Sequence, residues 1–287
     1  MAVMLPAKDV PLVCVVGAGP AGLAAAERLS AAGLKVAVYD RMPSLARKFL
    51  MAGRGGLNLT HSEPFERFLA RYGDASEHLA PALAAFPPQA LMEWATGLGE
   101  ETFIGTSGRV FPKSFKASPL LRAWLARLTE RGVTFHPRHA WRGWDGEKSL
   151  HFEGPEGPVS VACDAAILAL GGASWPRLGT DGSWAAILKG GGIKITDFAP
   201  ANMGVRVDWS DIYRTQFAGS PLKRIALAVD GIRVRGEAMV TDEGLEGGAV
   251  YALSHRLRDA TQQGPARLFV DLRPDIAEEL LAARFAT

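Results

Sequence analysis

The chain has 287 residues, of which 48% are hydrophobic and 22% charged, values typical of a globular protein with one large domain or two. A net charge of +2 gives no electrostatic reason to expect binding to nucleic acid or to an anionic membrane. The two cysteines, Cys14 and Cys163, form no C-x-x-C motif and no metal-ligand spacing, and no stretch is long enough to span a membrane, so we expect a reduced cytoplasmic protein without a metal site.

The first predicted unit is a strand, a glycine-rich turn and a helix. The apolar run Leu12–Val16 predicts the strand, the turn has the pattern G-x-G-x-x-G, and an alanine-rich helix follows to about Ala32. Gly17 permits a tight turn, Gly19 lets a pyrophosphate approach the backbone, and Gly22 lets the helix lie close to the sheet. The start of this helix therefore offers unpaired N–H groups to phosphates.

A second strand, Lys35–Tyr39, ends on Asp40, 18 positions after Gly22. An acid at this distance is placed to accept both hydroxyls of an adenosine ribose. Strand, glycine pattern, helix and acid together predict a dinucleotide-binding unit. The alternative is a glycine-rich turn in an ordinary βαβ unit.

Residues 41–62 form a basic segment that we expect to be a long loop. It contains four cations and no acid before Glu63, and its centre, residues 53–60, is rich in glycine. Such a loop can wrap a flat ligand with backbone N–H groups. It favours FAD over a nicotinamide cofactor, whereas the alternative is a solvated surface loop.

The next segments are expected to provide packing. Helical spacing predicts three short helices at about 64–71, 77–85 and 88–97, interrupted by prolines that include Pro81, and residues 102–111 predict a hairpin.

A longer helix is predicted to start with Ser118 as N-cap and to end near Arg131. Arg109, Lys113 and Lys116 precede it, and they suit either an anion or flavin edge or a solvent-facing basic turn.

A strand at 133–135 is followed by a predicted antiparallel meander and then by the apolar segment 164–170. Because that segment is continuously apolar, it predicts a fully buried strand. Gly171 and Gly172 follow it, where ligands sit beyond the carboxyl ends of strands in open α/β sheets. Residues 179–182 then open a helix to about residue 189.

These blocks together resemble the aminoacetone oxidase-like family of bacterial FAD-binding flavoproteins, relatives of the dehydro-bile-acid reductases. The matching blocks are VVGAGPAGLAAAERL, RKFLMAGRGGLNLTHSE, GRVFPKSFKASPLL, AAILALGGASWPRLGTDGSW and APANMGV. The segment GRGGLNLT stands where many relatives have a G-G-G-R-C-N-x-T type sequence, and the missing cysteine excludes thiol chemistry there.

The resemblance implies an α/β fold, a Rossmann-like FAD-binding domain of the glutathione-reductase type with an inserted antiparallel β domain. It implies FAD across the glycine turn, its ribose on Asp40, its adenine against the backbone at 139–140, and its flavin and phosphate ends near Lys48 and the 53–60 segment. The expected cofactor-binding residues are Gly17, Ala18, Gly19, Pro20, Ala21, Gly22, Asp40, Arg41, Lys48, Gly53, Arg54, Gly55, Gly56, Leu57, Asn58, Leu59, Thr60, Ala140, Gly171 and Gly172.

The domain prediction places the FAD-binding domain at 1–198, the inserted β domain at 199–272, and the start of a helical segment at 273–287. Asp230-Gly231 predicts a two-residue hairpin turn between strands 223–229 and 232–240. Relatives in the family return to the FAD domain near their C-terminus, and nothing after Leu272 resembles that return, so the sequence predicts a truncated chain that holds FAD weakly or leans on a partner.

The expected activity is that of a flavin oxidoreductase acting on a small organic substrate. No second G-x-G-x-x-G follows a strand, so a separate nicotinamide domain is not expected, and NAD(P)H or oxygen would complete the cycle transiently. Arg54 and Arg109 are hypothetical stabilisers of reduced flavin. No general base is predicted, and His61 is the best histidine candidate. The alternatives are an NAD-dependent dehydrogenase and a non-catalytic flavin-binding protein.

Overall fold

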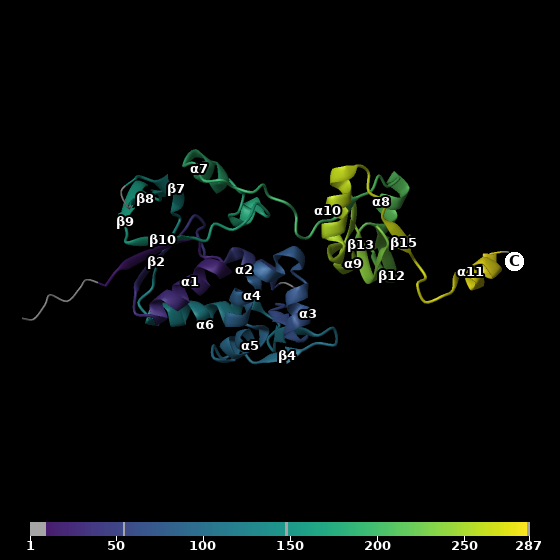
Figure 1. Ribbon diagram of the computed structural model, residues 1–287, viewed down its shortest axis with the longest axis horizontal. Helices are drawn as coiled ribbons and strands as arrows, with labels where there is room; N and C mark the ends of the chain where they lie inside the picture. Colours follow the sequence, from purple (N-terminus) through teal and green to yellow (C-terminus); the bar gives the residue numbers. More distant parts are fainter. Residues whose placement is uncertain (1–9, 54, 147–148, 286–287) are drawn as a thin grey trace, which may run out of the picture. The chain divides into compact units, whose positions relative to one another are not determined.

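A computed structural model describes residues 10–53, 55–146 and 149–285, and it divides into two compact units, Met1–Thr196 and Asp197–Thr287. Among the described residues, the first unit contains three sheets and the second unit one (Figure 1). Each unit has its own hydrophobic core. The candidate site lies in the first unit.

The central sheet of the first unit is parallel, with the strand order β10-β1-β2-β6. As the sequence predicts, Leu12–Val16 forms β1 and the next strand ends on Asp40. Val16 pairs with Tyr39 in register, so the carboxyl ends of β1 and β2 meet at one edge of the sheet. The four strands are β1 (Leu12–Val16), β2 (Lys35–Asp40), β6 (Thr134–Pro137) and β10 (Ala165–Leu168).

Both faces of the central strands β1 and β2 are covered, which explains why these two strands are continuously apolar. Successive side chains of a strand point to opposite faces, so Val15 and Val38 pack under helices α1 (Pro20–Ala31) and α6 (Ala117–Glu130). Cys14 and Tyr39 pack on the other face against a three-stranded antiparallel meander. The meander consists of β7 (Ala140–Trp144), β8 (Ser149–Gly154) and β9 (Gly157–Ala162).

Helix α1 is held in place by a mostly buried carboxylate, that of Glu27. Glu27 accepts hydrogen bonds from the indole N–H groups of Trp94, at 2.9 Å, and Trp124, at 2.7 Å, and from Arg127 at 2.9 Å. Only 12% of its side chain is exposed. Trp94 comes from α5 (Pro88–Thr96) and the other two from α6, so one side chain fixes α1 against two helices.

The region between β2 and β6 differs from the sequence prediction in two places. Residues 41–62 are not one loop, because Arg47–Ala52 forms helix α2. Helix α6 begins at Ala117, with Lys116 at the N-cap position and no side-chain cap, rather than after Ser118. The other elements here are β3 (Thr60–His61), α3 (Phe65–Ala70), η1 (Gly73–Ala75), α4 (Ser76–Ala85, with Pro81 inside it), β4 (Thr102–Ile104) and β5 (Arg109–Pro112).

Strand β10 also corrects a prediction. The apolar segment 164–170 predicts a fully buried strand, but Ala165, Ala166 and Leu168 are exposed and Ile167 is half-buried. The reason is position: β10 is an edge strand of the parallel sheet and pairs only with β1 among the described strands. After it come η2 (Pro176–Leu178) and α7 (Trp184–Gly190).

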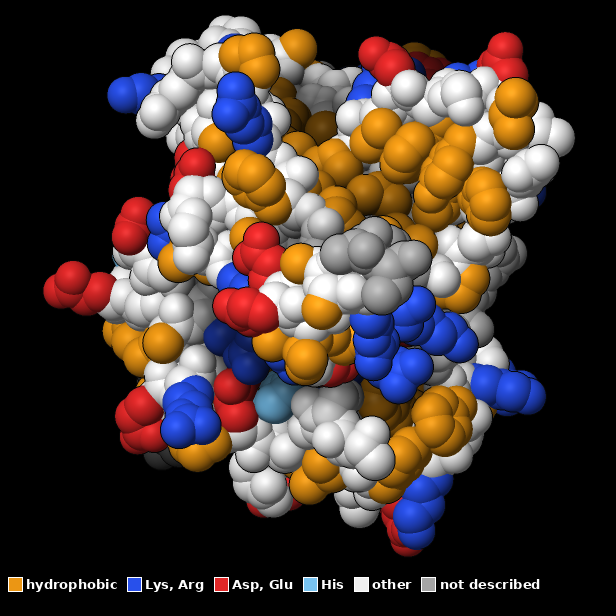
Figure 2. All heavy atoms as spheres, turned by 90° about the vertical axis from the view of Figure 1, so that its right-hand side faces the viewer, with side chains coloured by type: hydrophobic (Ala, Val, Ile, Leu, Met, Phe, Trp, Pro, Cys, Tyr) orange, Lys and Arg blue, Asp and Glu red, His pale blue; other side chains and the backbone are white. Residues whose placement is uncertain are grey.

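The second unit contains a five-stranded antiparallel sheet of order β11-β14-β13-β12-β15. Asp230 and Gly231 both have positive φ, which is the turn conformation their sequence predicts for the hairpin. Several large apolar side chains of this unit are exposed, among them Ile212 and Phe269. Figure 2, a space-filling view from one side, shows hydrophobic side chains at the surface among charged ones. The elements are β11 (Val205–Arg206), α8 (Asp211–Phe217), β12 (Pro221–Val229), β13 (Ile232–Val240), β14 (Gly244–Glu246), α9 (Gly248–Ala252), α10 (Ser254–Gln263), β15 (Phe269–Asp271) and α11 (Glu278–Phe285).

Candidate cofactor-binding site

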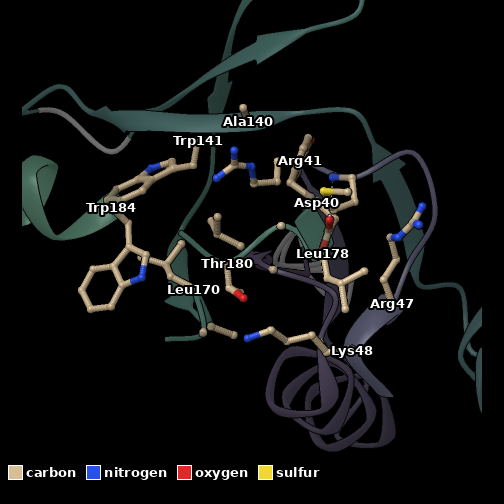
Figure 3. A pocket seen from close by; sticks show the side chains of 18 of the residues that line it. Asp40, Arg41, Arg47, Lys48, Ala140, Trp141, Leu170, Leu178, Thr180 and Trp184 are labelled. Atoms are coloured by element: carbon tan, nitrogen blue, oxygen red, sulfur yellow. Dashed lines mark hydrogen bonds between the residues drawn. The ribbon is translucent and has the colours of Figure 1, made fainter. Parts of the chain in front are cut away.

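A cavity of about 550 Å³ opens where β1 and β2 end and α1 begins. It is bordered by three further segments: the residues after β2, the first half of β7, and the stretch from the end of β10 to α7 (Figure 3). Nine of the residues predicted to contact a cofactor line it: Gly17, Gly19, Pro20, Ala21, Asp40, Arg41, Lys48, Ala140 and Gly171.

The glycines of the turn differ in what surrounds them. A Cβ on Gly17 would lie 2.3 Å from the carbonyl oxygen of Ala169, and one on Gly22 would lie 1.8 Å from the carbonyl oxygen of Gly17. These two glycines are needed for the packing of the chain itself. A Cβ on Gly19 would have no atom within 4 Å, so the space beside this residue is open toward a ligand. This cradle fits a diphosphate that approaches the backbone closely.

The start of α1 faces the same space. Gly19 is the N-cap residue, it makes no side-chain capping hydrogen bond, and Pro20 occupies the first helical position. The first N–H groups of a helix have no intrahelical partner, and the helix dipole places partial positive charge on them. An anion at this point of the cavity is stabilised by both effects.

Asp40 lies beside this helix start and is already engaged. One carboxylate oxygen accepts the N–H of Ala18 at 2.7 Å, and the other accepts the N–H of Met42 at 2.8 Å. Each carboxylate oxygen can accept a second hydrogen bond. Asp40 therefore orders the backbone on both sides of the cavity and retains acceptor capacity for ligand hydroxyls.

Four Lys and Arg residues line the cavity, and two of them, Arg41 and Lys48, approach it from different sides. Arg41 extends below Ala140 toward Trp141, whereas Lys48 enters from the side of α2 (Figure 3). Lys48 donates to the hydroxyl of Ser174 at 3.3 Å, and partial burial lowers the pKa of its ammonium. Arg41 pairs with Asp181 at 2.9 Å.

The other end of the cavity is apolar. Trp141, Leu170 and Trp184 line it and face one another in Figure 3. Trp141 is 7% exposed, and its indole N–H finds no hydrogen-bond acceptor among the described residues. A buried donor without an acceptor costs about 1–3 kcal/mol. A bound group that carries an acceptor at this end of the cavity would remove that cost, so the residues present fit an elongated ligand with a charged middle and an aromatic end.

The remaining predicted residues that the structure describes do not line this cavity. Ala18 is buried and Gly22 packs on the turn, so both support the site from behind. Arg54 lies outside the described residues. The structure places the others elsewhere in the first unit or beside the cavity without lining it: Gly53, Gly55, Gly56, Leu57, Asn58, Leu59, Thr60 and Gly172.

The 53–60 segment lies against α6 and a small antiparallel sheet. A Cβ on Gly53 would meet the Cβ of Ala117 at 2.5 Å, and Leu57 is buried, its N–H donating to the carbonyl oxygen of Phe115 at 3.2 Å. Thr60 pairs with Val110 in the sheet β3-β5-β4. The flavin contacts predicted for this segment stay a prediction.

His61, the histidine candidate for a base, is held by the backbone. Its Nδ1 accepts the N–H of Glu63 at 3.1 Å, so Nε2 carries the proton and donates to the carbonyl oxygen of Ser107 at 3.0 Å. Neither His61 nor Arg109, its partner across β3 and β5, lines the cavity.

Sequence reasoning did not single out several residues of the cavity. The signals were weak because tryptophans and single polar residues in a meander or loop are usually structural. Asp181 lies in the glycine-flanked turn 179–182, and Arg47 is one of the four cations of residues 41–62, but no sequence pattern points to Trp141, Ser44 or Trp184.

The two cysteines are free thiols. Burial, with Cys163 nearby, raises the pKa of the Cys14 thiol to about 12, so Cys14 is protonated at neutral pH. Within the described residues, no group of three His, Cys, Asp or Glu side chains is arranged to hold a metal ion. No helix in that part of the chain is both long enough and apolar enough to cross a membrane.

Comparison with protein families matches residues 11–256 to the HI0933-like protein Rossmann domain. A curated relative, the 3-dehydro-bile acid delta(4,6)-reductase of Clostridium scindens, is 23% identical over 285 residues, which cover 95% of this chain and 67% of the relative.

Solved structures with a similar fold include an open conformation of a flavocytochrome c3 fumarate reductase, with a TM-score of 0.49, 18% identity, and coverage of 64% of this chain and 41% of that chain. THI4 of Thermovibrio ammonificans has a TM-score of 0.42 at 16% identity, over 64% of this chain and 63% of that chain. The chain thus spans less than two thirds of the length of these solved chains.

Proposed function

The chain belongs to the HI0933-like Rossmann family of FAD-dependent oxidoreductases, and from this membership we propose that it binds FAD in the cavity at the start of α1 and transfers a hydride between the flavin and a small organic substrate. The observation that carries the proposal is the joint presence, in one cavity, of the open space at Gly19, the uncapped start of α1 and the Asp40 carboxylate.

Each wall of the cavity has a role in this proposal. The N–H groups at the start of α1 bind the diphosphate, and Asp40 accepts the ribose hydroxyls. Lys48 adds positive charge near the diphosphate, while Trp141 and Leu170 exclude water from the apolar end. Bound FAD supplies the hydride chemistry, and the protein supplies orientation and electrostatics.

We further propose that the substrate is reduced and that NAD(P)H is the transient electron donor. The support is the curated relative, whose name describes a reductase and which aligns with 95% of this chain. By analogy, the substrate class is a cyclic ketone with a conjugated double bond.

The first test is cofactor identification. The purified protein is denatured, and the released cofactor is identified by chromatography and mass spectrometry; protein freed of cofactor is then titrated with FAD and with NAD⁺. We expect FAD in the extract and saturable FAD binding. Release and binding of NAD⁺ alone would establish the nicotinamide dehydrogenase instead, and binding of neither would overturn the proposal.

The second test concerns the reaction. FAD-loaded protein is mixed with NADH or NADPH under anaerobic conditions, and bleaching of the flavin absorbance is followed before and after addition of a conjugated cyclic ketone. We expect bleaching by one of the two donors and recovery with the ketone. A protein that keeps FAD but is reduced by neither nicotinamide refutes NAD(P)H as the donor.

A further inference from the structure

An ion pair joins two segments that border the cavity from opposite ends of the first unit's sequence. Arg41 directly follows β2, and Asp181 stands between η2 and α7. The guanidinium Nη1 lies 2.9 Å from Oδ2 of Asp181, and both residues line the cavity. Their side chains are 43% and 33% exposed, so the pair is partly shielded from solvent.

Hydrogen bonds from Ser183 orient the carboxylate of Asp181 independently of Arg41. Its Oδ1 accepts the N–H of Ser183 at 3.1 Å and the hydroxyl of Ser183 at 2.7 Å, which leaves Oδ2 for the guanidinium. An acceptor that is already fixed loses little conformational freedom when the pair forms, so this pair avoids part of the entropy loss that weakens most exposed ion pairs.

The backbone around the pair is also close-packed. Gly179 has a φ of +97°, and a Cβ there would lie 2.5 Å from Cγ of Met42, the residue after Arg41. The hydrogen bond from Lys48 to Ser174 ties the same two segments a second time. Residues 174–181 therefore form a strap that rests on residues 41–48 along one side of the cavity.

We propose that Asp181 is a positioning residue that holds Arg41 across the adenosine end of the bound FAD, and that this ion pair slows release of the cofactor. The inference rests on the proposed function, because Asp40, the residue before Arg41, marks the ribose position. Arg41 reaches over the cavity from the side of Asp40 toward Trp141 (Figure 3). A ligand that leaves this end of the cavity must open the pair or move the strap.

The test measures the rate at which FAD leaves the protein, from the recovery of free-flavin fluorescence after dilution of the loaded protein. The variants are Asp181→Asn, Arg41→Met and the double variant. We expect each single variant to release FAD about two- to fivefold faster, and the double variant to match the singles, because both changes remove the same interaction. High salt should speed release from the unaltered protein and leave the variants nearly unchanged.

Arg206→Met is the matched control. It breaks a pair with Glu243 in the second unit that has an N···O distance of 3.5 Å and side chains 87% and 77% exposed. This variant should release FAD at the unaltered rate. Circular dichroism and thermal unfolding confirm that each variant is folded.

The outcomes separate the two claims. If the unaltered protein and the single variants release FAD equally fast, or if the effects of the two single variants add in the double variant, the ion-pair inference is overturned while the proposed function stands. If the unaltered protein retains no FAD, the proposed function fails, and the inference fails with it.

Discussion

Two glycine-rich segments of the first unit, residues 17–22 and 53–56, look alike in sequence and differ in surroundings. In each, two glycines are packed against the chain itself: Gly17 and Gly22 in the first, Gly53 and Gly56 in the second. Each also has one glycine, Gly19 or Gly55, at which a Cβ would meet no atom within 4 Å. Only the first segment lines the cavity and begins a helix of 12 residues.

The difference teaches that glycine content alone does not identify a ligand cradle. The open glycine of the first segment stands at a helix N-terminus, beside the carboxylate of Asp40, whereas Gly53 and Gly56 are in contact with α6 and the phenylalanines before it. Phosphate recognition needs converging N–H groups and helix charge as well as space. Substitutions in and around the two segments can show whether the place of the first segment, at a helix N-terminus beside Asp40, or its glycine content alone makes it the binding segment.

The largest effect is expected from Gly22→Ala. Its Cβ would lie 1.8 Å from the carbonyl oxygen of Gly17, so α1 must move away from the turn. We expect a loss of about 3 kcal/mol in the free energy of unfolding, at the upper end of overpacking costs, together with loss of FAD. Urea unfolding measures it. Gly190→Ala is the control, because nothing lies within 4 Å of its Cβ; a similar loss there would refute the packing explanation.

Glu27→Gln tests whether the placement of α1 matters. Oε2 of Glu27 accepts both indole N–H groups, and Oε1 accepts from Arg127, so the substitution removes the charge that faces Arg127 and puts an amide nitrogen in place of one of these two oxygens. We expect a loss of about 2 kcal/mol, because a mostly buried charge loses its partner but keeps part of its hydrogen bonding. FAD affinity should fall with it. Glu93→Gln, whose carboxylate is bonded to the exposed Gln89, should change stability by less than about 0.5 kcal/mol. If Glu27→Gln and Glu93→Gln lowered the free energy of unfolding equally, Glu27 would not be the residue that fixes α1 against α5 and α6.

The most predictable parts of the molecule were those governed by short-range rules. Residues 12–40 were predicted closely, because the strand, turn and helix each have strong local signals, and the hairpin at Asp230-Gly231 followed from turn chemistry. Helix α2 was missed because six residues with no cap signal carry too little pattern. The exposure of β10 depends on its place at the edge of the sheet, which its composition does not encode.

The residues of the candidate site also divide into those that local sequence rules predict and those that only the tertiary fold brings together. Positions 17–22 and 40 could be predicted because their spacing along the chain fixes their spacing in space. Asp181 and Trp141 come from a distant loop and a meander strand, and only the tertiary fold brings them to the cavity. Residue types alone gave no reason to choose them over other tryptophans and aspartates of the chain.

A pair of variants compares the two open glycines directly. Gly19 has a φ of −77°, which alanine adopts readily, so neither Gly19→Ala nor Gly55→Ala should change the free energy of unfolding by more than about 0.5 kcal/mol. Gly19→Ala should weaken FAD binding at least about tenfold, or about 1.4 kcal/mol, since its methyl group occupies the space for the diphosphate. Gly55→Ala should leave the affinity unchanged. If Gly55→Ala weakens binding as much, the cofactor extends to residues 53–60, and the flavin contacts predicted from the sequence for that segment gain support.

The smallest effect is expected for the pH dependence of the stability that Asp181, in the strap of residues 174–181, contributes. Hydrogen bonds from Ser183, with Arg41 adding to them, lower the pKa of Asp181 from 3.8 to about 2. A carboxyl group whose pKa is lower in the folded protein contributes stability that is complete above its unfolded pKa and is lost as the pH falls through the folded value. The difference in unfolding free energy between the unaltered protein and Asp181→Asn should therefore be constant from neutral pH to about pH 4 and shrink between about pH 4 and pH 2. Because a third of the Asp181 side chain is exposed, we expect this difference to stay below about 1 kcal/mol, and urea unfolding at a series of pH values measures it. A difference that instead vanished between pH 7 and pH 5 would place the titration on another group and would remove Asp181 as the residue that orients Arg41.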